Sequence, residues 1–239
     1  EHVICNLGVV GSNQTRGSER QKEWSKSSFL FFIYNHPANF FFMKETNIAT
    51  ASLPQQCRPA VKELLKEIYG YTDFRDFEVY NDLSSGKDKL KISQGQLIEE
   101  VIEESEKSMK TDSVYNFLLT APTGAGKSLL FQLPAIYLGQ EYKLLTIVIS
   151  PLKALIVDQV ENLRDLGYEK VSYASSDLSP EEKNEAYRQV REGETDLFYL
   201  SPELLLAYDI KHFIGDRRIG LIVVDEACLL YTSPSPRDG

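Results

Sequence analysis

The chain has 239 residues, with 35 Asp or Glu against 26 Lys or Arg, so its formal net charge is −9. This balance excludes a protein that coats nucleic acid through a broadly basic surface, and any grip on nucleic acid must be a local groove. The three cysteines lack disulfide or metal-ligand spacing and the three histidines are scattered, which argues against a metal-ligand cluster and predicts a reducing, intracellular compartment.

Residues 1–42 are predicted to be a non-native or disordered leader. The stretch Phe29 to Phe42 is apolar without a clear period, and Asn35, His36 and Pro37 interrupt it. It therefore falls short of the ~18 uninterrupted apolar residues of a membrane span, and it lacks a secretory cleavage site. A mobile leader and a membrane-anchoring segment are the alternatives. The preferred start of the authentic protein is Met43.

Region 43–114 is predicted to be a helical N-terminal part, in which Arg58 to Gly70 forms an amphipathic helix ended by glycine. Apolar strands and amphipathic helices then alternate. Strands are predicted at 114–120, 144–150, 171–174, 197–201 and 220–224, and helices from about 127 and at 152–166, 180–191 and 202–208. Repeated strand–helix units with short links predict an α/β fold with a doubly wound parallel sheet and right-handed crossovers.

The segment Ala121-Pro-Thr-Gly-Ala-Gly-Lys-Ser128 lies between a predicted strand and a predicted helix. Successive backbone N–H groups and a helix N-terminus there point at one anion, which predicts a phosphate cradle. Lys127 supplies charge for the β- and γ-phosphates and the Ser128 hydroxyl is placed to ligate Mg²⁺. A chance glycine-rich turn is the alternative. The predicted cradle residues are Thr123, Gly124, Ala125, Gly126, Lys127, Ser128 and Leu129.

A second chemical signal is the apolar run Gly220-Leu-Ile-Val-Val, which ends in Asp225 and Glu226. Such a run is typical of a strand covered on both faces, and strand ends are where parallel sheets place their sites. Asp225 is predicted to hold the Mg²⁺ with Ser128, and Glu226 to polarise the attacking water during γ-phosphate hydrolysis. A solvated turn is the alternative reading of an isolated Asp-Glu pair.

Four segments in order resemble the motifs of RecQ-like superfamily-two ATP-dependent DNA helicases of the DEAD/DEAH-box type. They are Gly124-Ala-Gly-Lys-Ser-Leu-Leu-Phe-Gln-Leu-Pro-Ala135, Ser150-Pro-Leu-Lys-Ala-Leu-Ile-Val-Asp-Gln-Val160, Leu197-Phe-Tyr-Leu-Ser-Pro-Glu203 and Val224-Asp-Glu-Ala227. The resemblance implies a P-loop NTPase lobe of RecA type over 115–227, with ATP and Mg²⁺ as cofactors. It also implies single-stranded or partly duplex DNA as partner.

The same resemblance implies an adenine site. Tyr69-Gly-Tyr-Thr-Asp-Phe-Arg75 is similar to the family's adenine element, which makes Tyr71 and Arg75 candidates for stacking on the base. The glutamine of that element is displaced by an apparent insertion, and Gln96 is the preferred match with Gln94 as second choice. Alternatively, Tyr71 and Phe74 pack beneath the sheet.

In the family, the second and third of these motifs contact the backbone of single-stranded DNA, which implies nucleic-acid contacts at Pro151, Lys153, Ser201 and Pro202. A solvated helix position is the alternative for Lys153. Residues 228–239 are predicted to be an adapter-derived tail.

The expected function is therefore that of the ATP-binding first lobe of an ATP-dependent DNA helicase. The lobe is incomplete here, and the fragment by itself is expected to be inactive and at most to bind nucleotide weakly. A translocase or remodeller that does not unwind, an RNA helicase and a non-enzymatic binding module are the alternatives. The signature strings of transport ATPases and GTP switches are absent from the sequence.

Overall fold

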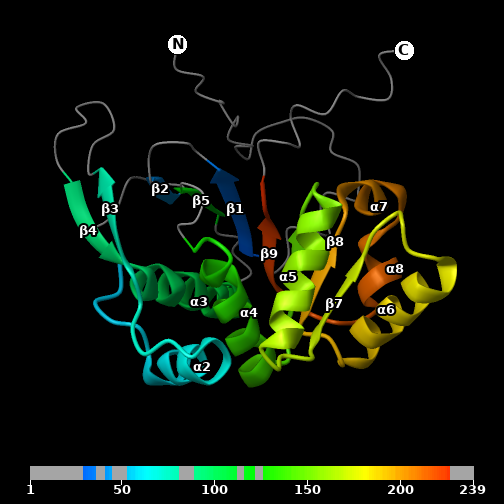
Figure 1. The fold of residues 1–239 in the computed structure, drawn as a ribbon, viewed down its shortest axis with the longest axis horizontal. Helices are drawn as coiled ribbons and strands as arrows, with labels where there is room; N and C mark the ends of the chain where they lie inside the picture. Colours follow the sequence, from blue (N-terminus) through cyan, green and yellow to red (C-terminus); the bar gives the residue numbers. More distant parts are fainter. Residues whose placement is uncertain are drawn as a thin grey trace, which may run out of the picture.

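The computed structural model describes residues 29–35, 41–44, 53–80, 89–111, 116–121 and 126–226, and the statements below refer to these ranges. A seven-stranded sheet in the order β2-β5-β1-β9-β6-β8-β7 forms the centre of the molecule (Figure 1). Neighbouring strands pair in parallel, except that β2 is antiparallel to β5. The strands are β1 (Phe29–Asn35), β2 (Phe41–Lys44), β5 (Asn116–Ala121), β6 (Leu145–Ile149), β7 (Val171–Ala174), β8 (Leu197–Leu200) and β9 (Ile219–Val224).

Helices cover both faces of this sheet. They are α2 (Pro59–Tyr69), α3 (Gln94–Thr111), α4 (Leu129–Tyr142), α5 (Lys153–Asp165), α6 (Pro180–Glu192), α7 (Pro202–Ala207) and α8 (Ile210–Ile214). Buried side chains of α2 to α5 form one apolar cluster with the sheet, and those of α6 to α8 form another. The predicted doubly wound α/β fold is thus confirmed.

The strand β8 shows why an unbroken apolar run forms here. Leu197 and Tyr199 belong to the first cluster, whereas Phe198 and Leu200 belong to the second. Successive side chains of a strand point to opposite faces, so a strand buried on both faces needs apolar residues at every position. Each such side chain contributes roughly 1.5–3 kcal/mol when it is fully buried.

The ends of the helices follow local signals. Helix α2 begins with Pro59 at its first position and ends at Gly70, whose φ of +71° is a left-handed conformation that glycine adopts without strain. Helix α6 begins with a capping box in which Ser179 and Glu182 satisfy each other's backbone N–H groups. Both helices were predicted within a residue or two of these bounds.

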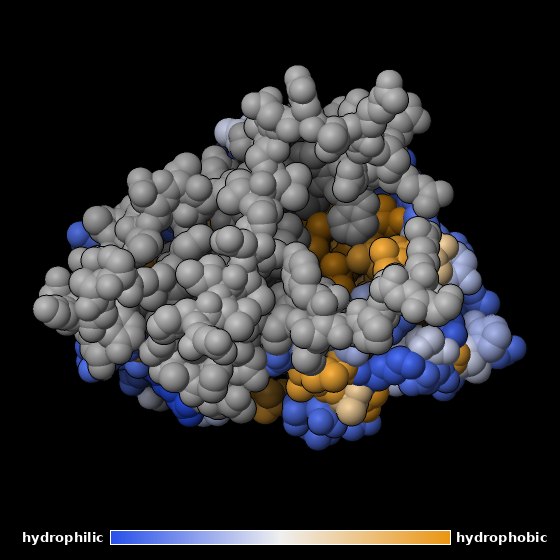
Figure 2. Space-filling model, turned by 90° about the horizontal axis from the view of Figure 1, so that it is seen from above, coloured by the Kyte–Doolittle hydropathy of each residue, from blue (hydrophilic) through white to orange (hydrophobic). Residues whose placement is uncertain are grey.

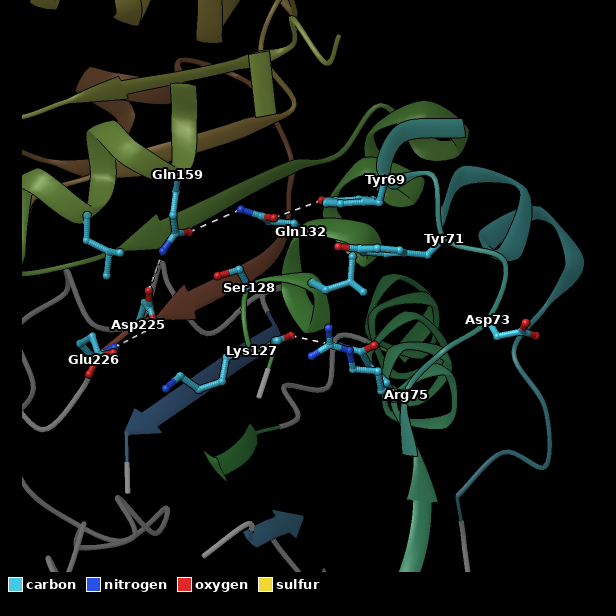
Figure 3. Close-up of a pocket in the computed structure, with 14 residues that line it drawn as sticks. Tyr69, Tyr71, Asp73, Arg75, Lys127, Ser128, Gln132, Gln159, Asp225 and Glu226 are labelled. Carbon is cyan, nitrogen blue, oxygen red and sulfur yellow. Dashed lines mark hydrogen bonds between the residues drawn. The ribbon is translucent and has the colours of Figure 1, made fainter. Parts of the chain in front are cut away.

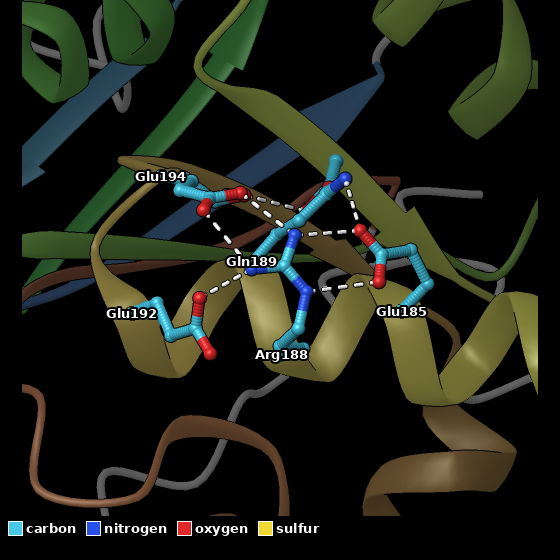
Figure 4. A network of polar contacts seen from close by, with 7 residues as sticks. Glu185, Arg188, Gln189, Glu192 and Glu194 are labelled. Atoms are coloured by element: carbon cyan, nitrogen blue, oxygen red, sulfur yellow. Dashed lines mark hydrogen bonds and ion pairs between the residues drawn. The ribbon is translucent and has the colours of Figure 1, made fainter.

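The outer face of α6 carries an acidic cluster around one arginine (Figure 4). Arg188 forms ion pairs with Glu185 at 2.7 Å and with Glu194 at 2.9 Å, and also with Glu192. Exposed pairs of this kind contribute little to stability because water and salt screen them. In the view from above, the right-hand margin of the molecule, on the side of α6, is largely hydrophilic (Figure 2).

Residues 29–35 form β1, which pairs with β5 on one side and β9 on the other. These residues were predicted to lie in a non-native or disordered leader, whereas the structure describes them as a strand of the sheet. A strand between two parallel neighbours needs no hydrophobic period, so the absence of a period in Phe29 to Asn35 is compatible with this position in the sheet. The non-native origin of the leader and of the tail stays a prediction.

A second, two-stranded sheet consists of the hairpin β3 (Asp76–Tyr80) and β4 (Lys89–Ser93). Figure 1 shows it at the edge of the molecule opposite α6 to α8. The hairpin, β1, β2 and α8 were not predicted from the sequence. Among the helices in the described ranges, none combines the length and the apolar composition needed to cross a membrane.

Candidate nucleotide-binding site

The start of α4 forms one wall of a cavity of about 610 Å³. Gly126 has a φ of +78°, and a Cβ added there would lie 3.0 Å from the Gln94 side-chain nitrogen. Ser128 occupies the N-cap position of α4, and its side chain makes no capping hydrogen bond. The backbone at 126 therefore requires glycine, and the Ser128 hydroxyl is compatible with a ligand role. The predicted residues Thr123, Gly124 and Ala125 lie outside the described residues.

The acidic end of the cavity is formed by the residues that follow β9. Asp225 is only 4% exposed, and its backbone N–H donates to the carbonyl of Ile149 at 2.9 Å. Its carboxylate accepts hydrogen bonds from the Gln159 side chain at 3.1 Å and from the Glu226 backbone N–H at 3.0 Å. Asp225 is thus held both through its backbone and through its side chain.

Burial raises the pKa of the Asp225 carboxyl above its ordinary value, while the Gln159 amide, the Glu226 N–H and the charge of Lys127 act in the opposite direction. Glu226 has a φ of +49°, a left-handed conformation that is uncommon for a residue with a side chain. Such backbone conformations cluster at functional sites, because the surrounding structure must hold them.

The opposite end of the cavity is lined by Tyr69, Tyr71, Arg75 and Gln94 (Figure 3). Tyr71 is 54% exposed, so it does not pack beneath the sheet. Phe74 does pack against the core, and it lies so close to Gly95 that a Cβ added there would meet the ring at 2.5 Å. The packing alternative therefore holds for Phe74 and not for Tyr71.

The structure places Gln94, rather than Gln96, in this cavity. The Gln94 side chain donates to the carbonyl of Gly126 at 3.1 Å. Gln96 instead accepts from the Ser93 N–H and donates to the Pro54 carbonyl, both at 2.9 Å, and lines a smaller pocket. The preference for Gln96 is thereby corrected, because the side chain of Gln96 is used to fix the start of α3.

The hairpin β3–β4 explains how Gln94 reaches Arg75. Its strands pair from Asp76 with Ser93 outward, and the Gln94 N–H donates to the Arg75 carbonyl at 2.7 Å. The apparent insertion in the sequence is therefore looped out, and its two ends meet at the cavity.

Eight of the residues predicted for a common site line this one cavity. They are Tyr71, Arg75, Gly126, Lys127, Ser128, Leu129, Asp225 and Glu226. The predictions did not include Tyr69, Gln132 and Gln159, which also line it. A signal for Gln132 and Gln159 was present in the sequence, because each is a polar residue at an inward position of a helix, α4 or α5, whose other inward residues are apolar.

The residues predicted to contact nucleic acid follow adjacent strand ends, since Ile149 of β6 pairs with Leu200 of β8. Pro151 and Pro202 are partly exposed, but Ser201 is fully buried, so its hydroxyl is withdrawn from the surface. The Lys153 ammonium lies 2.6 Å from the Asp177 carboxylate. This ion pair is exposed, so it is compatible with the alternative of a solvated helix position, and the nucleic-acid contact of Lys153 stays a prediction.

Comparison with known proteins identifies the family. Residues 93–233 match the DEAD/DEAH box helicase family, which is more than half of the chain. The chain belongs to the DEAD/DEAH box helicase family. The RecQ-like resemblance and the RecA-like type of lobe are confirmed with it.

Among relatives of this DEAD/DEAH box helicase chain, the "ATP-dependent DNA helicase Q-like 5" of Arabidopsis thaliana is 31% identical over 191 residues, which cover 80% of the chain and 18% of the relative. The "ATP-dependent DNA helicase RecQ" of a Synechocystis species is 33% identical over 183 residues, which cover 75% of the chain and 32% of the relative. The "ATP-dependent helicase SGS1" of Saccharomyces cerevisiae is 40% identical over 111 residues, which cover 44% of the chain and 8% of the relative. The chain thus spans a third or less of the length of each of these relatives.

Proposed function

We propose that this chain is the ATP-binding lobe of an ATP-dependent DNA helicase, and that it binds ATP with Mg²⁺ in the cavity between α4, β9 and the end of α2. The observation that carries the proposal is that one cavity has the helix start at Lys127 and Ser128 and the carboxylates of Asp225 and Glu226 on its walls. Its volume of about 610 Å³ lies within the range of ligand sites, roughly 300–1,000 Å³.

The donor set fits a hard divalent cation. The Asp225 carboxylate and the Ser128 hydroxyl offer oxygen ligands, which Mg²⁺ prefers, usually with several waters. The carboxylate is buried and anchored, so it loses little freedom when an ion binds. When bound, the ion would neutralise charge on the β- and γ-phosphate oxygens.

The other groups then have distinct roles. The Lys127 ammonium and the backbone at Gly126 hold the phosphate tail, and Glu226 orients and polarises the attacking water. Tyr71 and Arg75 offer an aromatic and a guanidinium plane for the base, and Gln94, which also lines the cavity, would read the base edge.

Nucleic acid would be held at the loops after β6 and β8. The N-termini of α5 and α7 there present backbone N–H groups, which suit contacts to phosphates that are independent of sequence. Pro151 and Pro202 mark these loops, and the exposed Lys153 ammonium, which has three N–H donors, would contribute beside its ion pair with Asp177. The outer face of α6 is excluded from this role because its carboxylates surround Arg188.

Isothermal titration with ATP and Mg²⁺ tests the proposal. Lys127→Ala removes a charged phosphate contact, so the affinity should fall by roughly 10-fold or more, as expected for a lost bond to a charged group. Lys66→Ala, at an exposed position of α2, is the matched control and should bind as the unchanged chain does. Equal affinity in both variants would show that the cavity is not the nucleotide site.

A further inference from the structure

Four hydrogen bonds join the two ends of the cavity. Figure 3 draws the first and the last of them, together with a longer hydrogen bond of 3.5 Å from the Gln132 amide to the Gln159 carbonyl oxygen. The Tyr69 hydroxyl donates to the Gln132 carbonyl oxygen at 3.1 Å, and the Gln132 amide donates to the Tyr199 hydroxyl at 3.0 Å. Tyr199 donates to the Gln159 carbonyl oxygen at 2.9 Å, and the Gln159 amide donates to Asp225 at 3.1 Å. The chain of bonds runs from the end of α2 through α4, β8 and α5 to the end of β9.

All four bonds run in one direction, and the last acceptor determines that direction. An ionised Asp225 carboxylate can only accept, so the Gln159 side chain must present its NH₂ group to it. The Gln159 oxygen then faces Tyr199, which must donate, and the Tyr199 oxygen must accept from Gln132. Burial raises the pKa of Tyr199, so its hydroxyl keeps the proton that it donates.

Water has little access to these side chains. Tyr199 is fully buried, and Gln132 and Gln159 are 5% and 7% exposed. A buried amide that loses its partner carries the full cost of desolvation, so each member holds its neighbour in one orientation. A network of this kind resists rotation of the Asp225 carboxylate.

We infer that Gln159 is a positioning residue that orients the Asp225 carboxylate for a divalent cation, and that Gln132, Tyr199 and Tyr69 hold Gln159 in place. The network thereby links Tyr69, at the end of the cavity proposed for the base, to the Asp225 carboxylate at the end proposed for the cation. This inference rests on the proposed function, because it assigns Asp225 to the cation. Groups that orient a metal ligand from behind typically change metal affinity by about 10-fold to 100-fold when they are removed.

The first experiment separates metal binding from nucleotide binding. The affinity of the chain for ATP is measured with Mg²⁺ and again with EDTA, for Gln159→Leu and for the control Gln140→Leu at an exposed position of α4. In Gln159→Leu the gain in affinity from Mg²⁺ should shrink about 10-fold or more, while affinity in EDTA changes less than about twofold. An unchanged gain from Mg²⁺ would overturn the inference.

The second experiment tests the link to Tyr69 without a base. Inorganic tripolyphosphate replaces ATP, so a lost contact between Tyr69 and adenine cannot contribute. Tyr69→Phe removes only the hydroxyl, and the gain from Mg²⁺ should fall about fivefold, the effect of one net hydrogen bond. If Tyr69→Phe weakens ATP binding and leaves tripolyphosphate binding unchanged, Tyr69 acts on the base alone and the link is wrong.

A third measurement needs neither nucleotide nor metal. The side-chain amide signals of Gln159, assigned through its backbone resonances, should exchange slowly with solvent in the unchanged chain and faster in Tyr199→Phe. If Gln159→Leu does not fold, the conservative Tyr199→Phe and Tyr69→Phe variants still decide the question by NMR. Exchange that is unaffected by Tyr199→Phe would overturn the network, whereas slow exchange in a chain that binds no ATP would overturn only the proposed function.

Discussion

Asp225 and Glu226 are neighbours in sequence and have different environments. The side chain of Asp225 is buried and accepts two hydrogen bonds, whereas Glu226 is half-exposed and has a left-handed backbone. A fixed carboxylate suits an ion of strict geometry, and a more exposed one suits contact with water. Two residues of the same charge thus acquire separate roles through their environments.

Cys57 shows the converse case, in which the environment suppresses reactivity. The thiol is 7% exposed, and burial together with the nearby Glu99 carboxylate raises its pKa to about 12. The reactive thiolate is therefore almost absent at pH 8. In a Cys5→Ser/Cys228→Ser variant, DTNB should modify native Cys57 at least about 100-fold more slowly than in denaturant.

The control for this prediction is the same variant unfolded in guanidinium chloride, where the thiol has its ordinary pKa. Comparable rates in the folded and unfolded chains would mean that the segment before α2 opens readily in solution.

At the scale of elements, the hairpin β3–β4 is an addition that leaves the cavity intact. Its base is joined by the bond between Gln94 and Arg75, and among its described side chains Phe77 and Ile92, both near that base, pack against the core. The contacts that position the cavity residues are thus at the base of the hairpin, and we expect its outer part to contribute little to them.

Replacement of residues 79–90 by Asn-Gly tests this view, since that pair favours the two-residue turn of a hairpin. Because Glu78 and Lys91 are paired in register, the shortened strands can still meet. Affinity for ATP with Mg²⁺ should stay within about twofold and the unfolding midpoint within a few degrees, measured by titration and by circular dichroism. A large loss of affinity would mean that the outer hairpin holds Gln94 or Arg75 in place.

At the scale of the whole molecule, the cavity joins parts that are far apart in sequence. Its lining comes from the end of α2, the start of α3, α4, α5 and the end of β9. A ligand that contacts all of them is expected to stabilise the fold as a unit, because it binds the folded state and not the unfolded chain.

At a free ATP–Mg²⁺ concentration of about 100 Kd, this linkage adds about 2.7 kcal/mol to the free energy of unfolding. For a chain of this size that corresponds to an increase of roughly 5–10 °C in Tm, measured by differential scanning fluorimetry. The Lys127→Ala variant should lose most of the increase and serves as control. An increase in Tm of equal size in that variant would place the binding elsewhere.

The sequence predicted most of the parallel sheet and its helices because their signals are local. Strand β7 and helices α2, α5, α6 and α7 lie within two residues of the predicted bounds. The phosphate-loop and acidic residues were also predicted, since motif spacing and strand ends suffice for them. The hairpin was not predicted, because residues 76–93 show no strong hydrophobic period. Strand β1 was not predicted either, because its apolar residues do not alternate with polar ones.

The sequence by itself determined which chemical groups are available for the site, because glycine, lysine and carboxylate side chains have the same chemistry in any fold. Tertiary structure decided the choice between Gln94 and Gln96, the burial of Ser201 and the bond from Gln159 to Asp225. Each depends on which side chain faces a neighbour from a distant part of the sequence. Such orientation follows from packing and from the need to satisfy buried polar groups, and no local pattern records it.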